Sequence, residues 1–328
     1  MILSTGLLRR IARSHPTILL DVLASPANAS VLDGASHVRR VLVFDKRRPG
    51  SYMGTALALR RAAYDAVIDC MVTAPSLTTL MLMGLTGARY RIGIAGRDAG
   101  AGLRGAINVP VPPSSRAHIA DKLGALATAF GLDPDALDWR PEISLTPTEL
   151  AAARAIWTSD ATDRARAPAG ARGGPAGLRV LVNVSAGTAA RRWPVERYVA
   201  VIAHIMSREG DANVVVVAAP WERSRALETA RETGGRAVDT PRLRDALALV
   251  ATADFVLTPD TSITHAASAF ARPAITMCPE HSVAEWGLYG EPGESVTYPG
   301  EAIVALQSER VIDAVDRVLA RSGGERRS

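Results

Sequence analysis

The chain has 328 residues, which is long for one compact core and favours two domains. Hydrophobic residues make up 48% of it and charged residues 22%, which excludes a disordered chain and is typical of a globular protein. The net charge is +5, but lysine and arginine do not cluster among aromatic residues, so we expect no nucleic-acid partner.

The first residues, MILSTGLLRRIARSHP, predict a helix that ends before Pro16, because Leu7, Leu8 and Ile11 recur near helical spacing. Short apolar runs then alternate with helical patterns. The runs predict strands over residues 17–24, 40–44, 65–70, 89–94, 179–185, 213–219, 254–259 and 273–278. The helical patterns cover residues 51–63, 75–86, 116–130, 194–208, 221–233, 241–252, 261–271 and 301–321. The apolar runs are continuous rather than alternating, which indicates parallel sheets covered by helices on both faces.

One segment divides this α/β pattern into two halves. Residues 158–177, TSDATDRARAPAGARGGPAG, contain little that could be buried and predict a flexible linker. We therefore expect an N-terminal domain over residues 1–157 and a C-terminal domain over residues 178–328. Ligands of such folds bind beyond the carboxyl ends of the strands, so that edge is where functional residues are expected.

The compartment is predicted from cysteines and apolar segments. Cys70 and Cys278 lie far apart in apolar runs, and we expect both to be buried thiols in a reducing environment. No apolar run reaches membrane-spanning length. The N-terminus lacks the long apolar region and the cleavage site of a signal peptide. A cytoplasmic protein is the expectation.

Two loops contain the candidate site residues. The first follows the strand at 179–185 and contains Ser185, Thr188, Arg191 and Arg192 before Pro194 opens a helix. Hydroxyls, free amides and guanidinium groups at such a turn suit an anionic ligand, above all a diphosphate. The alternative is a polar turn with solvated arginines.

The second loop, in DFVLTPDTSITHAASAFARPAITMC, connects two predicted strands through a short helix. Asp260, Thr261 and Ser262 stand where this helix begins, and His265 follows one helical turn after Thr261. They could form a ligand site. Alternatively, Asp260, Thr261 and Ser262 only cap the helix and His265 is a buried, hydrogen-bonded histidine.

Several segments together resemble a known family. RRWPVERYVAVI resembles the basic Trp-Pro motif of glycosyltransferase family 9, the lipopolysaccharide heptosyltransferases. TPDTSITHAASAFARPAITM, followed by EWGLYG, is similar to that family's Asp-Ser/Thr-Gly-x-x-His block and its Trp-Gly-x-Tyr-Gly segment. YDAVIDC, ARYRIGI and HIADKLGALATAFGL match in order and spacing, so the resemblance covers nearly the whole chain.

The resemblance implies a GT-B fold, in which two Rossmann-like domains with parallel sheets face each other across a cleft, with the last helix packing back toward the N-terminal domain. It implies that Thr188 and Arg191 hold the donor diphosphate. Asp260 would bind sugar hydroxyls, and the amides of Thr261 and Ser262 would meet the phosphates, with His265 beside them. Ser262 replaces the family's usual glycine. CPEHS at 278–282 also departs from the family's pattern, which leaves contacts from that loop open.

The family's proposed general base is an aspartate in a loop that precedes the first helix. The resemblance places this aspartate and the strand before it upstream of Met1, so we assign no catalytic base within the chain. A missing central strand would leave unpaired amides, and we expect lower stability than in a longer chain, or association through that edge. Asp69 and His118 are possible substitutes, but Asp69 is better explained as a cap of the next turn, and His118 as the cap of its helix or a surface residue.

The resemblance implies an inverting glycosyltransferase that needs no metal or other cofactor. It would move a heptose or a related sugar from ADP-heptose to a lipid A–core oligosaccharide. Such an acceptor is membrane-anchored, and the basic helix at residues 7–13 is a candidate for peripheral contact with the inner membrane, although a solvated face explains it better. The alternatives are a nucleotide-sugar epimerase on the same fold and a nucleotide-sugar-binding protein with impaired catalysis.

Overall fold

The computed structural model describes residues 1–73, 76–95, 105–158, 177–290 and 292–325. The chain forms two compact units, unit 1 over Met1–Ser144 and unit 2 over Leu145–Ser328. The division lies nearer the N-terminus than the boundary expected at residue 157. The predicted linker at 158–177 lies almost wholly outside the described residues.

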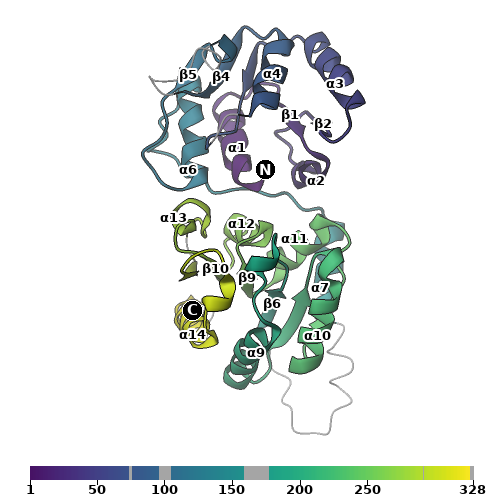
Figure 1. Cartoon of the computed structure of the whole chain (residues 1–328), viewed down its shortest axis with the longest axis vertical. Helices are drawn as coiled ribbons and strands as arrows, with labels where there is room; N and C mark the ends of the chain where they lie inside the picture. Colours follow the sequence, from purple (N-terminus) through teal and green to yellow (C-terminus); the bar gives the residue numbers. More distant parts are fainter. Residues whose placement is uncertain (74–75, 96–104, 159–176, 291, 326–328) are drawn as a thin grey trace. The chain divides into compact units, whose positions relative to one another are not determined.

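Unit 2 contains a parallel sheet with the strand order β11-β10-β9-β6-β7-β8. Figure 1 labels three of its neighbouring strands, β10, β9 and β6. Its strands are β6 (Arg179–Asn183), β7 (Asn213–Val217), β8 (Arg236–Ala237), β9 (Phe255–Pro259), β10 (Ala274–Pro279) and β11 (Gly293–Tyr298). Every residue of β7, β9 and β10 is buried, as their continuous apolar runs predict. At the centre of the sheet, Val182 of β6 pairs with Val216 of β7 and with Leu257 of β9.

Helices cover both faces of this sheet. They are α7 (Pro147–Thr158), α9 (Val195–Glu209), α10 (Arg223–Thr233), α11 (Leu243–Thr252), α12 (Ser262–Ala269), α13 (Val283–Trp286) and α14 (Ser308–Glu325), with 3-10 turns η4 (Ala189–Arg191), η5 (Pro220–Glu222) and η6 (Ile303–Ala305). α9 packs Tyr198, Val201, Ile202 and Ile205 into the main core, and α14 lies against α9, β10 and β11. α11 and α12 pack on β6, β9 and β10. That α14 also packs toward the other unit stays a prediction.

Unit 1 holds two separate parallel sheets. One consists of β1 (Asp21–Ala24) and β2 (Arg40–Val43), and the other of β3 (Ala66–Ile68), β4 (Tyr90–Ile94) and β5 (Val109–Val111) in this order. β1 pairs only with β2, and β3 pairs only with β4, among the described residues. The prediction of a further strand in this domain stays a prediction.

The helices of unit 1 are α1 (Thr5–Ser14), α2 (Pro26–Ala29), α3 (Gly50–Arg61), α4 (Leu77–Thr86) and α6 (Ile119–Gly124), with 3-10 turns η1 (Ile2–Ser4), η2 (Ser30–Leu32) and η3 (Ala125–Phe130). The predicted N-terminal helix is confirmed as α1 with η1 before it. Its apolar residues Leu7, Leu8 and Ile11 are buried. At Gly6 an added Cβ would lie 2.4 Å from the carbonyl oxygen of Trp139, so α1 approaches that backbone as closely as only glycine permits.

Some elements differ from the sequence prediction. The helix predicted over 116–130 is a short α-helix followed by a 3-10 helix, and the last helix begins at Ser308 rather than near 301. β5, β8 and β11 were not predicted, because two are very short and the third, GESVTY, is polar at an edge of the sheet. α7 was missed as well, although Thr146 and Glu149 hydrogen-bond to each other's amides as a capping box does. No helix in the described parts of the chain is long and apolar enough to cross a membrane.

Candidate functional site

Three loops of unit 2 leave the carboxyl ends of the neighbouring strands β6, β9 and β10. From β6 the chain continues outward through β7 to β8, and then returns to β9 on the other side of β6. The topological switch point therefore lies between β6 and β9. Open parallel sheets bind their ligands at the carboxyl edge beside such a point.

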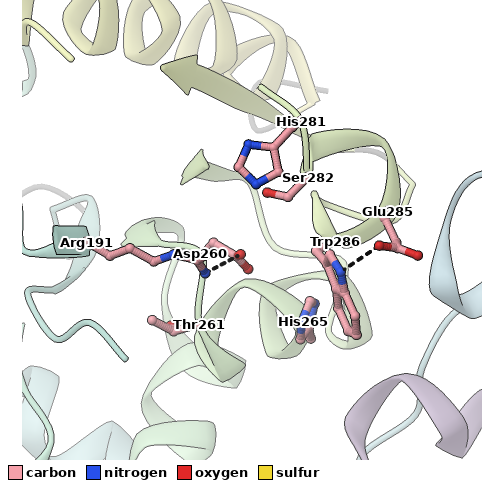
Figure 2. Close-up of a pocket in the computed structure, with 8 residues that line it drawn as sticks. All are labelled: Arg191, Asp260, Thr261, His265, His281, Ser282, Glu285 and Trp286. Atoms are coloured by element: carbon pink, nitrogen blue, oxygen red, sulfur yellow. Dashed lines mark hydrogen bonds and ion pairs between the residues drawn. The ribbon is translucent and has the colours of Figure 1, made fainter. Parts of the chain in front are cut away.

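A cavity of about 480 Å³ opens at these loops. It is lined by Arg191, Asp260, Thr261, His265, His281, Ser282, Glu285 and Trp286 (Figure 2). The volume is in the range of small-molecule sites, and most of the lining side chains carry polar or charged groups. The cavity therefore suits a polar, charged ligand.

The loop after β6 brings Arg191 to the cavity, but not its other three predicted residues. The amide of Ala219 donates to the Ser185 hydroxyl, which ties this loop to the one after β7. Arg192 donates to the buried carboxylate of Glu222 at 2.6 Å, so its guanidinium stabilises the loop. Thr188 is exposed and stands at the start of η4.

The loop after β9 brings Asp260, Thr261 and His265 to the cavity. Thr261 is the N-cap of α12, because its hydroxyl oxygen accepts from the amide of Ile263 at 3.2 Å. Thr261 therefore both caps the helix and lines the cavity. Nothing among the described residues accepts a hydrogen bond from the amide of the exposed Ser262. That amide is available to an anion at the positive end of the helix.

Hydrogen bonds among side chains beneath the cavity hold the loop after β9 in place. Asn183 at the end of β6 donates to Thr258 at 2.9 Å and to Thr261 at 3.2 Å. Thr264 of α12 lies 2.8 Å from the hydroxyl of Thr276 on β10 and donates to the carbonyl of Pro259. These bonds join three strands and the helix start, so the cavity floor is organised before any ligand binds.

The loop after β10 supplies the other half of the cavity lining, namely His281, Ser282, Glu285 and Trp286. The indole nitrogen of Trp286 donates to Glu285 at 3.0 Å, and its ring lies 6.2 Å from that of His265 between centroids. After Trp286 the chain needs glycine, because a Cβ at Gly287 would lie 2.6 Å from the carbonyl oxygen of Val283. The segments CPEHS and EWGLYG, noted in the sequence, contain these four residues, but none of the four was predicted to belong to the site.

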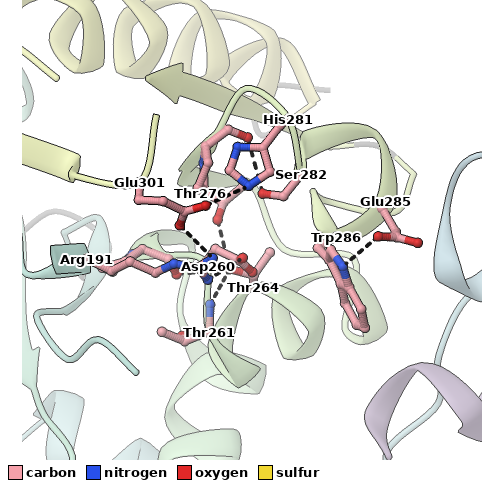
Figure 3. A network of polar contacts seen from close by, with 12 residues as sticks. Arg191, Asp260, Thr261, Thr264, Thr276, His281, Ser282, Glu285, Trp286 and Glu301 are labelled. Carbon is pink, nitrogen blue, oxygen red and sulfur yellow. Dashed lines mark hydrogen bonds and ion pairs between the residues drawn. The ribbon is translucent and has the colours of Figure 1, made fainter. Parts of the chain in front are cut away.

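Charged groups form a network around Arg191 (Figure 3). Its guanidinium lies 3.4 Å from the carboxylate of Asp260 and 3.8 Å from that of Glu301, and Glu301 also lies 3.2 Å from the ring of His281. Burial raises the pKa of Asp260 above its usual value, although the charge of Arg191 lowers it in part. Arg191 is therefore shared between a largely buried carboxylate and an exposed one. An anionic ligand can replace the exposed one at little cost.

The two residues of unit 1 considered as alternative bases have structural partners. The carboxylate of Asp69 accepts from the amide of Met71 at 3.1 Å and holds the turn after β3. His118 is the N-cap of α6 and accepts from the amide of Ala120 at 3.1 Å. Both capping interpretations are confirmed. Within the described ranges, no group of three or more His, Cys, Asp or Glu side chains could hold a metal ion.

Comparison with known proteins identifies the family of the chain. The sequence model of glycosyltransferase family 9 (heptosyltransferase) matches residues 55–305. No curated protein matches the sequence significantly.

Solved structures are similar along nearly the whole chain. A family 9 glycosyl transferase from Veillonella parvula DSM 2008 has a TM-score of 0.78 at 15% identity, covering 98% of this chain and 93% of that one. Escherichia coli ADP-heptose lps heptosyltransferase II has 0.73 at 17% identity, covering 98% and 96%. Escherichia coli heptosyltransferase WaaC with ADP has 0.72 at 18% identity, covering 98% and 94%. The likeness shows the GT-B fold.

Proposed function

The chain belongs to glycosyltransferase family 9, and on that basis we propose that it transfers a heptose or a related sugar from ADP-heptose to a lipopolysaccharide core acceptor. The observation that carries the proposal is the cavity at the carboxyl edge of unit 2, where Arg191 and Asp260 meet beside the start of α12. Two similar structures are described as heptosyltransferases, and one of them contains ADP.

The charges of the cavity suit the leaving group of such a transfer. When an acceptor hydroxyl attacks the anomeric carbon, the bond from that carbon to the phosphate oxygen breaks and the nucleoside diphosphate leaves as an anion. Arg191 would stabilise this charge as it develops, together with the amide of Ser262 at the positive end of α12. Thr188, exposed on the neighbouring loop, would add a hydroxyl donor.

Asp260 suits the donor sugar. A carboxylate accepts hydrogen bonds from neighbouring sugar hydroxyls, and Asp260 is held in place by its amide, which donates to the carbonyl of Met277 at 2.9 Å. The attacking hydroxyl must also lose its proton to a base. We assign that base to no residue in the described parts of the chain. A membrane-anchored acceptor would bring the protein to the inner membrane from the cytoplasmic side.

Nucleotide-dependent thermal stabilisation tests the donor site. We would compare the melting temperature with excess ADP, UDP and GDP, without metal. Ligand at about 100 times its dissociation constant stabilises the fold by about 2.7 kcal/mol, or several degrees. We expect ADP to have the largest effect, and Arg191→Gln to reduce it. Arg223→Gln, at an exposed arginine paired with Asp239, is the matched control and should leave the shift unchanged.

Release of nucleoside diphosphate with and without acceptor tests the reaction. Release that requires a core oligosaccharide supports transfer, whereas release without any acceptor indicates an epimerase or hydrolase. A shift with UDP alone would contradict the ADP-heptose donor. A cooperative melt that no nucleotide shifts would contradict the donor site.

A further inference from the structure

Helices α3 and α4 of unit 1 expose large apolar side chains in regular rows. On α4 these are Leu77, Met81 and Leu85, one helical turn apart, with Leu77 87% exposed. On α3 they are Met53, 78% exposed, and Leu57, again one turn apart. Single exposed apolar residues are ordinary, but rows of them on adjacent helices indicate a binding surface.

The two helices pack against each other, so the two rows lie on neighbouring helices (Figure 1). The C-terminal ends of the two helices are close to each other. A Cβ added at Gly87, the residue after α4, would lie 3.1 Å from the guanidinium of Arg60 near the end of α3. We call Met53, Leu57, Leu77, Met81 and Leu85 the α3–α4 surface.

The charges around the α3–α4 surface are of one sign. Neither helix contains an acidic residue, and the segment from residue 46 to residue 97 contains only two, Asp65 and the buried Asp69. Basic side chains stand at both ends of α3, and they are exposed: Lys46, Arg47, Arg48, Arg60 and Arg61. Of these, Arg48 pairs with Asp45 at 3.3 Å.

Apolar side chains beside an excess of basic ones are typical of a surface that binds an anionic bilayer. We propose that the α3–α4 surface docks on a membrane containing anionic lipids, with the apolar rows at the acyl boundary and the arginines on the headgroups. The proposal rests on the proposed function, which requires a membrane-anchored acceptor, and it says which part of the chain makes the contact.

The basic helix at residues 7–13 was a candidate for membrane contact, with a solvated face as the alternative. Its apolar residues Leu7 and Ile11 are packed inside unit 1. Arg9 pairs with Glu142 at 3.0 Å, and Arg10 donates to the carbonyl of Asp138. α1 therefore has no apolar face left for a bilayer, which favours the alternative of a structural helix with a solvated basic face.

Vesicle co-sedimentation of the unmodified chain, without nucleotide or acceptor, tests the proposal independently of the donor site and the reaction. We expect binding to vesicles containing phosphatidylglycerol and much weaker binding to pure phosphatidylcholine. The triple variant Leu77→Ser/Met81→Ser/Leu85→Ser should bind about tenfold more weakly or worse. Each of Arg60→Gln and Arg61→Gln should cost about fivefold, because one basic residue near an anionic surface contributes about that factor.

Trp221→Ser/Leu227→Ser is the matched control, because it removes exposed apolar side chains from unit 2 and should leave vesicle binding unchanged. Circular dichroism and melting curves of every variant confirm folding. No binding to anionic vesicles overturns the proposal, and so does equal binding to neutral ones. If the wild type forms a dimer that the α4 variant dissociates while vesicle binding persists, the surface pairs two copies and the proposal is wrong.

Discussion

Replacing Glu301 by glutamine should strengthen nucleotide binding. The Glu301 carboxylate lies 3.8 Å from the guanidinium of Arg191 and 3.2 Å from the ring of His281, where it neutralises the arginine that a diphosphate would use. The Glu301 side chain is 68% exposed, so its contact with Arg191 is a surface ion pair, worth at most about 1 kcal/mol. Because a ligand must displace this carboxylate, Glu301→Gln should lower the dissociation constant for ADP by up to about fivefold.

Isothermal titration calorimetry with ADP measures this change. The gain should shrink at high salt, since salt screens exposed charges. Glu280→Gln is the matched control: it removes the same charge one residue from His281, at an exposed side chain, and no ion pair with Arg191 is lost. Weaker ADP binding by Glu301→Gln would refute the reasoning and assign Glu301 a direct role in holding the ligand. An equal gain from Glu280→Gln would show that only overall charge matters.

Three further predictions concern stability and reactivity. Glu149→Gln should cost about 3 kcal/mol in chemical denaturation at pH 7, because it leaves the buried guanidinium of Arg244 without its carboxylate. Arg244 lowers the pKa of Glu149 to about 2, so the wild type loses this advantage, and the two proteins converge, as the pH falls from about 4.5 toward 2. Trp193→Ala should cost about 3–5 kcal/mol in the same assay, since the ring is fully buried and its indole donates to the carbonyl of Leu306 at 3.0 Å. Burial raises the pKa of the Cys278 thiol to about 12, so it should resist alkylation at pH 8 until the protein unfolds, and rapid labelling of the native protein would contradict this.

The sequence predicted unit 2 well because its local patterns and its tertiary structure agree. The runs around Val182, Val216 and Leu257 are apolar at every position, and the strands that they form are buried on both faces. Pro194 ends the loop before α9, and Gly210 follows the helix with a positive φ, so both ends of α9 can be read from the chain. Where an element is short or lies at an edge, as β8 and β11 do, the pattern is too weak to show it.

The candidate site was predictable in part for a similar reason. Asp260, Thr261 and His265 lie within one strand–helix segment, so their spacing alone places them together. Arg191 joins them from a loop about seventy positions earlier, because β6 and β9 pair in the sheet. Glu301 contacts Arg191 although it stands outside every recognisable motif. Only the order of the strands brings such residues together, and no local pattern contains that order.

The strands of unit 1 show what an apolar pattern measures. The run DAVIDC at residues 65–70 predicts a strand buried on both faces, yet Ala66, Val67 and Ile68 of β3 are only half-buried. β1 is similar, and each of the two has one strand partner among the described residues. Their starting points are joined by side chains instead, because the hydroxyl of Tyr64 donates to the carboxylate of Asp21 at 2.7 Å. An apolar run indicates that a strand has side chains suited to burial on both faces. Whether those faces are buried depends on the neighbouring strands and helices, which the run itself does not show. The α3–α4 surface follows the same rule. Its exposed apolar rows indicate that something covers them, but the sequence pattern does not identify that partner.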